Sequence, residues 1–170
     1  MQFYPINKMI YSRSDLENKI NNAIEKISWN LSPQNLYDPI RYVLSGGGKR
    51  LRPILTLMAT NLFSDDIDLS IPPALGIEIF HNFTLLHDDL MDRADMRRGN
   101  PTVHKIWGNN AAILSGDAML IQAYMYIANV PLNILPQILS IFSDTAMEVC
   151  QGQQYDMDFE KRMDVTEAEY

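Results

Sequence analysis

The spacing of apolar residues predicts α-helices along nearly the whole chain. From Leu16 to Ile27 apolar side chains recur every three or four positions, which is typical of an amphipathic helix. Ser14 is expected to cap this helix with Glu17, as in a capping box, and Pro33 to end or follow it. Further helices are expected over residues 36–44, 50–63, 72–92, 109–129 and 132–159. No segment alternates as a strand does, so the expected fold class is all-α.

The composition is that of a folded protein of about one domain. The chain has 170 residues, of which 46% are hydrophobic and 21% charged, so it can bury a core. Its net charge of -7 argues against nucleic acid as the main partner. No apolar run approaches the roughly 20 residues of a membrane span, and residues 1–10 lack a signal-peptide pattern. The single cysteine, Cys150, cannot form an internal disulfide, which favours a reducing compartment such as the cytoplasm.

One face of the expected helix over residues 72–92 carries acidic residues and a histidine. Glu78, His81, Asp88 and Asp92 fall within a sector of about 80° if each residue turns the helix by about 100°. Asp88 and Asp92 lie one turn apart, where their carboxylates repel each other unless a cation lies between them. Mg²⁺ suits such a pair, because it commonly takes one or two carboxylates together with water and substrate phosphate. Asp89 is expected as a neighbouring ligand or acceptor, although this short pattern also fits a solvated helix end.

Basic residues lie on both sides of the acidic motif in the sequence. Arg97 and Arg98 follow Asp92 and precede a Gly-Asn-Pro turn, which is expected to fold both arginines back beside the carboxylates. Upstream, Lys49 and Arg52 are three residues apart after a run of three glycines, and we expect them to share a helical face. Free N–H groups at a helix start favour an anion, and arginine binds phosphate with two hydrogen bonds. Acids for a metal and cations for phosphate are the two halves of a pyrophosphate site.

Taken together, these segments resemble one known family. In this order and at these intervals, GGGKRLRP, HNFTLLHDDLMD, RADMRRGNPTVH, SGDAML and GQQYD look like the first half of a trans-isoprenyl diphosphate synthase, the polyprenyl synthetase family. The resemblance implies a helical bundle of the isoprenoid synthase type. It also implies a Mg²⁺-dependent prenyltransferase that condenses isopentenyl diphosphate with an allylic diphosphate, head to tail, and is usually a homodimer.

The resemblance also implies a role for individual residues. Asp88 and Asp92, with Asp89 between them, match the ligands of the Mg²⁺ ions that hold the allylic diphosphate. Arg97 matches a contact to that same diphosphate and completes the catalytic group with Asp88 and Asp92. The diphosphate of isopentenyl diphosphate is expected in a metal-free pocket matched by Lys49, Arg52, His81 and Arg98. Two further residues, Gln153 and Asp156 of GQQYD, match a motif that lines the same cavity.

The residues just before the acidic motif bear on product length. Thr84 lies one turn before Asp88 on nearly the same face, and Phe80 and Phe83 flank it. A small Thr84 leaves room for a growing chain, whereas Phe83 resembles the floor residue of short-chain synthases. We expect farnesyl or geranylgeranyl diphosphate as the product.

The sequence departs from the family in one respect, because it contains no second aspartate-rich motif. Asp65 and Asp66 are adjacent acids without arginine partners, and Thr166 near the end resembles the cap of another helix. We therefore expect residues 1–170 to be the N-terminal part of a single all-helical prenyltransferase domain, incomplete for activity by itself. A terpene cyclase is a weaker alternative, because such enzymes lack the GGGKRLRP and RRG segments. A non-catalytic partner subunit is the other alternative, favoured only by the missing motif.

Overall fold

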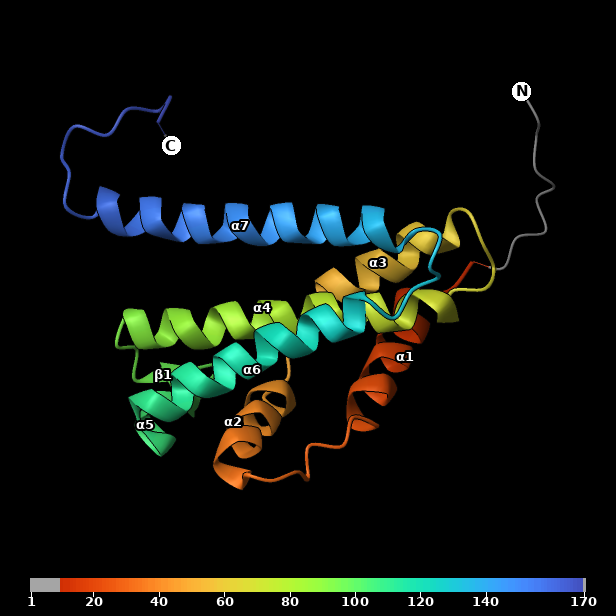
Figure 1. The fold of residues 1–170 in the computed structure, drawn as a ribbon, viewed down its shortest axis with the longest axis horizontal. Helices are drawn as coiled ribbons and strands as arrows, with labels where there is room; N and C mark the ends of the chain where they lie inside the picture. The colour runs from red at the N-terminus through yellow and green to blue at the C-terminus, as the bar shows by residue number, and fades with distance from the viewer. Residues whose placement is uncertain (1–9, 170) are drawn as a thin grey trace. The chain divides into compact units, whose positions relative to one another are not determined.

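The structure is a computed structural model, and residues 10–169 are described (Figure 1). It consists of two compact units that divide between Val130 and Pro131. The first unit contains α1 (Arg13–Glu25), α2 (Gln34–Ser45), α3 (Leu51–Asn61), the short 3₁₀ helix η1 (Asp68–Ser70), α4 (Ile71–Met91), the strands β1 (Met96–Arg97) and β2 (Asn100–Pro101), α5 (Val103–Trp107) and α6 (Asn109–Ile127). The second unit contains α7 (Leu135–Phe159).

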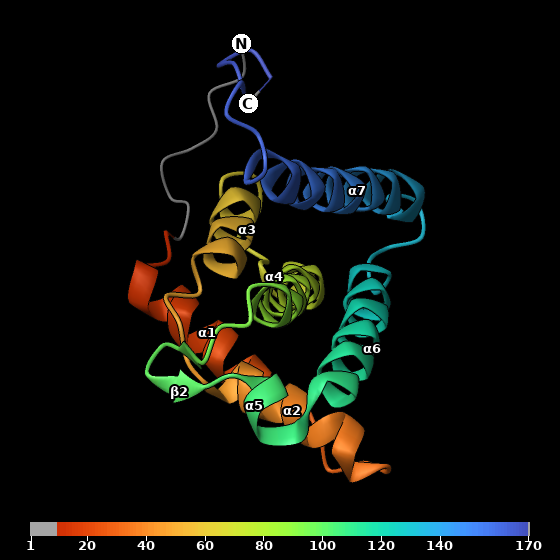
Figure 2. The ribbon, with the colours of Figure 1, turned by 90° about the vertical axis from the view of Figure 1, so that its left-hand side faces the viewer.

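Helix α4 is the centre of the first unit. It is apolar along most of its length and begins with prolines at its first positions, which a helix start tolerates because those N–H groups have no partner within the helix. Helices α1, α2, α3, α5 and α6 all contact it, and Figure 2 shows α4 nearly end-on between them. Neighbouring helices therefore surround the polar residues of α4 and determine their hydrogen bonds and pKa values.

The cap of helix α1 lies two residues earlier than predicted, at Ser12. The Ser12 hydroxyl accepts a hydrogen bond from the Asp15 N–H, and the Asp15 carboxylate accepts one from the Ser12 N–H. The prediction that Ser14 and Glu17 form the capping box is therefore wrong, because the same spacing occurs at Ser12 and the fold uses that one. The helix buries its apolar face in a core cluster made of Leu16, Ile20, Ile54, Leu57, Ile67 and Ala74.

The segment after α4 contains two elements that the periodicity did not predict. Strands β1 and β2 pair antiparallel, with Met96 opposite Pro101 and Arg97 opposite Asn100. The expectation of no strand is thus wrong for this hairpin, because strands of two residues are too short to show an alternating pattern. Helix α5 is only five residues long, which is also below the length at which a helical period is visible.

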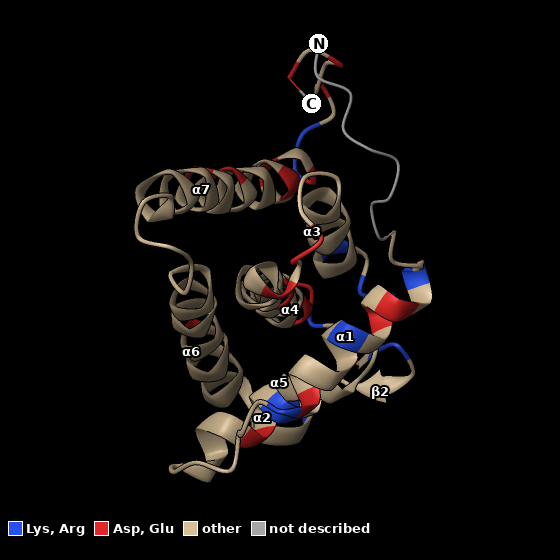
Figure 3. Cartoon of the chain, turned by 90° about the vertical axis from the view of Figure 1, so that its right-hand side faces the viewer, with Lys and Arg blue, Asp and Glu red and all other residues tan. Residues whose placement is uncertain are grey.

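The second unit is described by itself. Helix α7 starts three residues later than predicted, because Pro131 accepts hydrogen bonds from Ile134 and Leu135 in a preceding turn. All charged residues of α7 are acidic, whereas α6 is almost uncharged (Figure 3). Near the end, the Thr166 N–H donates to the Glu169 carboxylate, as at the start of a helix. Among the described residues no helix is both long and apolar enough to span a membrane.

Helices α4 and α6 approach each other closely at Gly76. A β-carbon there would lie 2.8 Å from Ile127 Cγ1 and 3.0 Å from the Ala123 carbonyl oxygen. Because the second contact is backbone, it cannot move away as a flexible side chain would. The close approach holds the first part of α4 against the end of α6.

We expect Gly76→Val to destabilise the fold by about 2 to 3 kcal/mol, because the added atoms overpack this contact. Thermal or denaturant unfolding would measure the loss. Gly152→Ala is the control, since a β-carbon at Gly152 meets nothing within 4 Å and alanine favours a helix over glycine. Equal stability of Gly76→Val and the parent chain would contradict the close packing.

Candidate diphosphate-binding site

The acidic residues of the predicted site lie on the last turn of α4. Asp89 is buried, Asp88 is half-buried and Asp92 is the exposed residue that ends the helix. Arg97 on β1 reaches two of them, with Nη2 2.8 Å from Asp88 Oδ2 and Nε 2.7 Å from Asp89 Oδ1. The prediction that the turn folds an arginine back beside the carboxylates is confirmed for Arg97.

The hairpin that carries Arg97 is held at its base and by a contact from α2. Its two central residues, Arg98 and Gly99, have φ values of 53° and 81°, the positive values that a type I′ turn requires. The Thr102 hydroxyl donates to the Ala94 carbonyl at 2.7 Å and closes the base. From α2, the Tyr42 hydroxyl donates to the Pro101 carbonyl at 2.7 Å. These contacts fix the arginines relative to α4 and α2.

The second arginine of the hairpin takes a different direction. Arg98 donates to the carbonyl of Gly47 in the glycine loop and not to a carboxylate. The prediction that both arginines fold back beside the carboxylates is therefore wrong for Arg98. Adjacent residues of a hairpin turn point to different sides, which separates the two guanidinium groups. Gly48 has a φ of 144°, and a β-carbon there would lie 2.9 Å from Arg98 Nη1. Glycine therefore allows both the backbone conformation and the close approach of Arg98.

Other predicted phosphate contacts lie beside the glycine loop. Arg52 Nη1 lies 3.3 Å from His81 Nε2, which brings the first turn of α3 to the middle of α4. Lys49 is exposed and precedes α3, which begins at Leu51. The prediction that Lys49 and Arg52 share a helical face is therefore wrong, because Arg50 takes a left-handed conformation with φ 47° and starts the helix after Lys49.

The surroundings of His81 favour its neutral form. Burial lowers the pKa of His81 below its ordinary 6.5, and the positive charges of Arg52, Arg98 and Arg97 lower it further against the opposing Glu78. The imidazole is therefore neutral at pH 7. Because the unfolded chain binds this proton more readily, the stability that the fold owes to neutral His81 is lost as the pH falls through and below 6.5.

An NMR titration of the His81 ring should give a midpoint below 6.5. Arg52→Gln should raise that midpoint by removing a nearby positive charge, and inorganic diphosphate should raise it in the parent chain. A midpoint at or above the ordinary value, unaffected by Arg52→Gln, would contradict the cationic surroundings.

The carboxylates fit a metal in their chemistry but are not gathered around one point. Among the described residues, no three His, Cys, Asp or Glu side chains are close enough to hold one ion. The guanidinium of Arg97 instead supplies the positive charge between Asp88 and Asp89. Burial raises the pKa of Asp89, and the hydrogen bond from Arg97 opposes this rise. Since Mg²⁺ needs only one or two carboxylates, Asp88 and Asp92 suit it, and the Mg²⁺ site stays a prediction.

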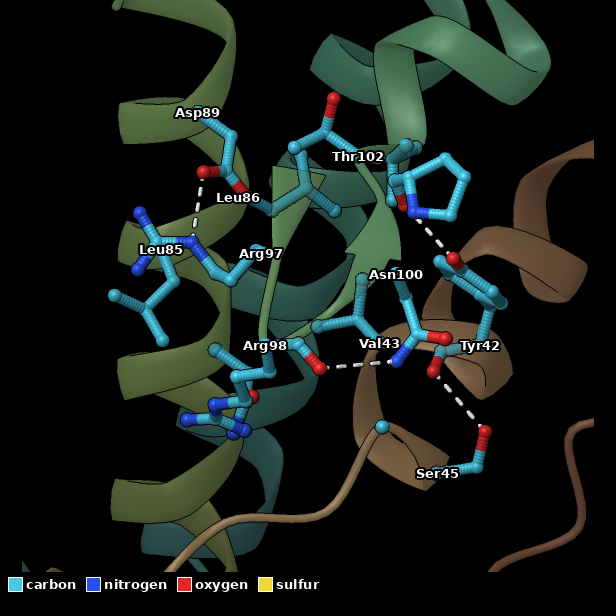
Figure 4. A pocket seen from close by; sticks show the side chains of 14 residues that line it. Tyr42, Val43, Ser45, Leu85, Leu86, Asp89, Arg97, Arg98, Asn100 and Thr102 are labelled. Atoms are coloured by element: carbon cyan, nitrogen blue, oxygen red, sulfur yellow. Dashed lines mark hydrogen bonds and ion pairs between the residues drawn. The ribbon is translucent and has the colours of Figure 1, made fainter. Parts of the chain in front are cut away.

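A cavity of about 200 Å³ lies under the hairpin, between α2 and α4 (Figure 4). Residues of α4 that line it include Asn82, Leu85, Leu86 and Asp89, and the hairpin adds Arg97 and Arg98. The residues predicted to set product length do not line this cavity. Thr84 donates to the His81 carbonyl at 2.8 Å, and the Phe83 ring lies 5.6 Å from that of Phe80 and 4.7 Å from that of His87. Their role in product length stays a prediction.

Gln153 and Asp156 lie on α7, in the second unit. Gln153 is half-buried and Asp156 is exposed. Their predicted place in the cavity stays a prediction.

One pair of residues at the site was not predicted. Arg50 and Glu78 form a buried ion pair, with Nη1 2.6 Å from Oε1. The sequence placed Glu78 on the acidic face without a partner and left Arg50 without a role. The sequence carries no local signal for this contact, because Glu78 lies 28 positions from Arg50.

Comparison with known proteins agrees with this geometry. The profile of the polyprenyl synthetase family matches residues 33–170. A geranylgeranyl diphosphate synthase of Methanosarcina mazei is 42% identical over 151 residues, which cover 87% of this chain and 46% of that protein. A geranylgeranyl pyrophosphate synthase of Geoglobus acetivorans is 39% identical over 167 residues, covering 97% of this chain and 51% of that protein.

Solved structures give the same result for the fold. The crystal structure of a geranylgeranyl pyrophosphate synthase superposes with a TM-score of 0.90 at 45% identity, covering 95% of this chain and 49% of that one. The synthetase from Geoglobus acetivorans gives a TM-score of 0.88 at 39% identity, covering 92% and 52%. The chain thus spans about half the length of the curated relatives it matches. With a family profile matched over most of its residues and an all-helical isoprenoid synthase fold, the chain belongs to the polyprenyl synthetase family.

Proposed function

We propose that the protein containing this chain is a chain-elongating prenyltransferase that joins isopentenyl diphosphate to an allylic diphosphate. The observation that carries the proposal is the separation of two charged groups along α4. Arg97 with Asp88 and Asp89 forms one group, and Arg52 with His81 forms the other. The seven residues from His81 to Asp88 correspond to about 10 Å along a helix. This spacing allows two diphosphates to bind side by side without competing for one place.

The acidic group is proposed to hold the allylic substrate. Asp88 and Asp92 would bind Mg²⁺, which supplies charge that stabilises diphosphate as a leaving group. Arg97 is already placed beside Asp88 and would contact the same diphosphate with its fork of N–H donors. When the bond from carbon to the diphosphate oxygen breaks, Arg97 stabilises the negative charge that develops on the departing group.

The cationic group is proposed to hold isopentenyl diphosphate without a metal. Arg52 and Arg98 supply positive charge, and neutral His81 can donate one hydrogen bond or gain a proton when the anion binds. Lys49 is exposed at the edge of this group. The double bond of the held substrate then attacks the allylic carbon and a proton is lost. The released diphosphate can accept this proton, so no side chain need act as base.

The relatives support a short-chain product. Those named above are geranylgeranyl diphosphate synthases, and we propose a product of fifteen or twenty carbons. Magnesium as cofactor, a homodimer and a cytoplasmic location belong to the same proposal. So does the assignment of residues 1–170 to the N-terminal part of a single domain, since the matched relatives are about twice as long.

The test is to express the complete open reading frame that contains these residues and to incubate the protein with Mg²⁺, labelled isopentenyl diphosphate and each of three allylic starters. We expect labelled prenyl diphosphates in increments of five carbons. If the complete protein extends no starter alone but changes the products of an added synthase, it is a partner subunit and the proposal fails. No extension under any condition would also contradict it.

A further inference from the structure

Arg50 and Glu78 form an unusually buried ion pair. Their side chains are 5% and 4% exposed, and of the ion pairs between described residues this alone has both partners less than a tenth exposed. Removing two charges from water is unfavourable, and a buried pair is often no more stabilising than apolar residues of similar volume. A gain in stability is therefore a weak explanation for this ion pair. Its position in the fold suggests a different role.

Arg50 joins three segments at one point. One end of its guanidinium donates to Glu78 on α4, and Nη2 donates to the Leu44 carbonyl in the last turn of α2 at 2.7 Å. Its own backbone takes the left-handed conformation, with φ 47°, which is unfavourable for a residue with a side chain. Arg50 lies between the glycine loop and the start of α3. The side-chain contacts therefore hold a conformation that the backbone does not prefer.

Glu78 is fixed from its own helix. Asn82 Nδ2 donates to the Glu78 carboxylate at 3.1 Å and to the Glu78 carbonyl at 2.8 Å. Asn82 is itself buried, with 1% of its surface exposed. The carboxylate thus offers Arg50 a partner that has little freedom to move. One turn further along α4 lies His81, which contacts Arg52.

The residues next to Arg50 in the sequence are those of the cationic group. Lys49 precedes it directly and Arg52 follows two residues later. Arg98 holds the other side of the same loop through the Gly47 carbonyl. Any shift of Arg50 therefore moves Lys49 and Arg52 relative to His81 and Arg98.

We propose that the Arg50–Glu78 pair positions the metal-free diphosphate pocket, by fixing the glycine loop and the start of α3 against α4. Neither residue touches the diphosphate; both act through Lys49, Arg52 and His81. The inference rests on the proposed function, because it assigns this pair to one of the two substrates. It requires that loss of the pair selectively weakens the binding of isopentenyl diphosphate. Binding of the allylic substrate, which Asp88 and Arg97 are proposed to hold, should be unaffected.

The test uses Arg50→Lys and Glu78→Gln in the complete protein. Lysine keeps the charge but cannot reach both Glu78 and the Leu44 carbonyl, and glutamine keeps the shape but not the charge. We expect the KM for isopentenyl diphosphate to rise about tenfold, with the KM for the allylic substrate and kcat within about twofold. Leu16→Ala is the control, because it opens a cavity in the core cluster on α1 and lowers the melting temperature without touching the loop.

A purely structural role predicts that the three variants behave alike, losing active protein while both KM values stay at the parent level, and this result would overturn the proposal. Failure of both Arg50→Lys and Glu78→Gln to fold would overturn it too, since the pair would then hold the fold as a whole. Calorimetric titration of isopentenyl diphosphate in EDTA separates the two proposals. A parent protein that binds it without turnover contradicts the proposed function alone, and weaker binding by the variants still supports positioning. Absence of binding to the parent protein contradicts both.

Discussion

Asp88→Ala in the complete protein is expected to lower magnesium-dependent prenyl transfer by on the order of a thousandfold while the fold stays intact. The side chain of Asp88 is 31% exposed and pairs with Arg97 from the neighbouring hairpin. It supports no core contact, so its loss should leave the melting temperature nearly unchanged. Its carboxylate is, however, the member of the acidic group that lies both at the helix surface and beside the arginine. Without it, the ion loses a ligand, and Arg97 keeps only its hydrogen bond to Asp89 beside the place where the allylic diphosphate is proposed to bind.

The measurement is steady-state turnover at several magnesium concentrations, with circular dichroism to check the fold. Asp65→Ala is the matched control, since it removes an exposed acid from the loop before η1 and changes the net charge by the same amount. Its turnover should equal that of the parent protein. Parent-like turnover by Asp88→Ala would remove Asp88 from the metal site.

Thr84→Phe is expected to shorten the main product by at least one unit of five carbons. Thr84 is half-buried and lies four residues before Asp88, which is about 6 Å along a helix. A hydrocarbon chain that grows from a diphosphate at Asp88 toward the start of α4 would pass this position. The added ring occupies that path, so elongation stops earlier, and product release replaces a further condensation.

Chromatography of dephosphorylated products would measure the chain length. Thr84→Ser is the control, because it keeps the hydroxyl that donates to the His81 carbonyl and adds no bulk. Its products should match those of the parent protein. An unaltered product distribution for Thr84→Phe, in a variant with normal stability, would place the growing chain elsewhere.

The sequence predicted the elements whose signal is long and local. The apolar period of α4 extends over 21 residues, and such a run gives a helix whatever surrounds it. The same period placed His81, Asp88 and Asp92 on one face, because their angular positions follow from helix geometry alone. A turn near Arg98 was also predictable, since a glycine within a short polar segment marks a reversal of the chain. The predicted Gly-Asn-Pro turn was misplaced, however, because the turn is centred on Arg98 and Gly99, and Asn100–Pro101 forms strand β2.

The order of segments, more than any single motif, indicated the family. A DDxxD pattern by itself also fits a solvated helix end, and a basic helix start is common in other proteins. The combination of GGGKRLRP, HDDLMD and RRG restricts the number of protein families that fit, because a site that binds two diphosphates needs acidic and cationic side chains together. The family was therefore determined by the sequence, whereas the positions of these groups relative to one another were not.

Only the tertiary structure decided which cations face the carboxylates and which are buried. Arg97 and Arg98 are neighbours in sequence, yet one pairs with Asp88 and the other with the Gly47 carbonyl, because the turn sends them to opposite sides. Arg50 lies between two exposed basic residues but is itself buried against Glu78, 28 positions away. Such contacts depend on how α2, α3 and α4 pack. A local pattern fixes the face of a helix on which a residue lies, but the partner that meets this face comes from a distant part of the chain.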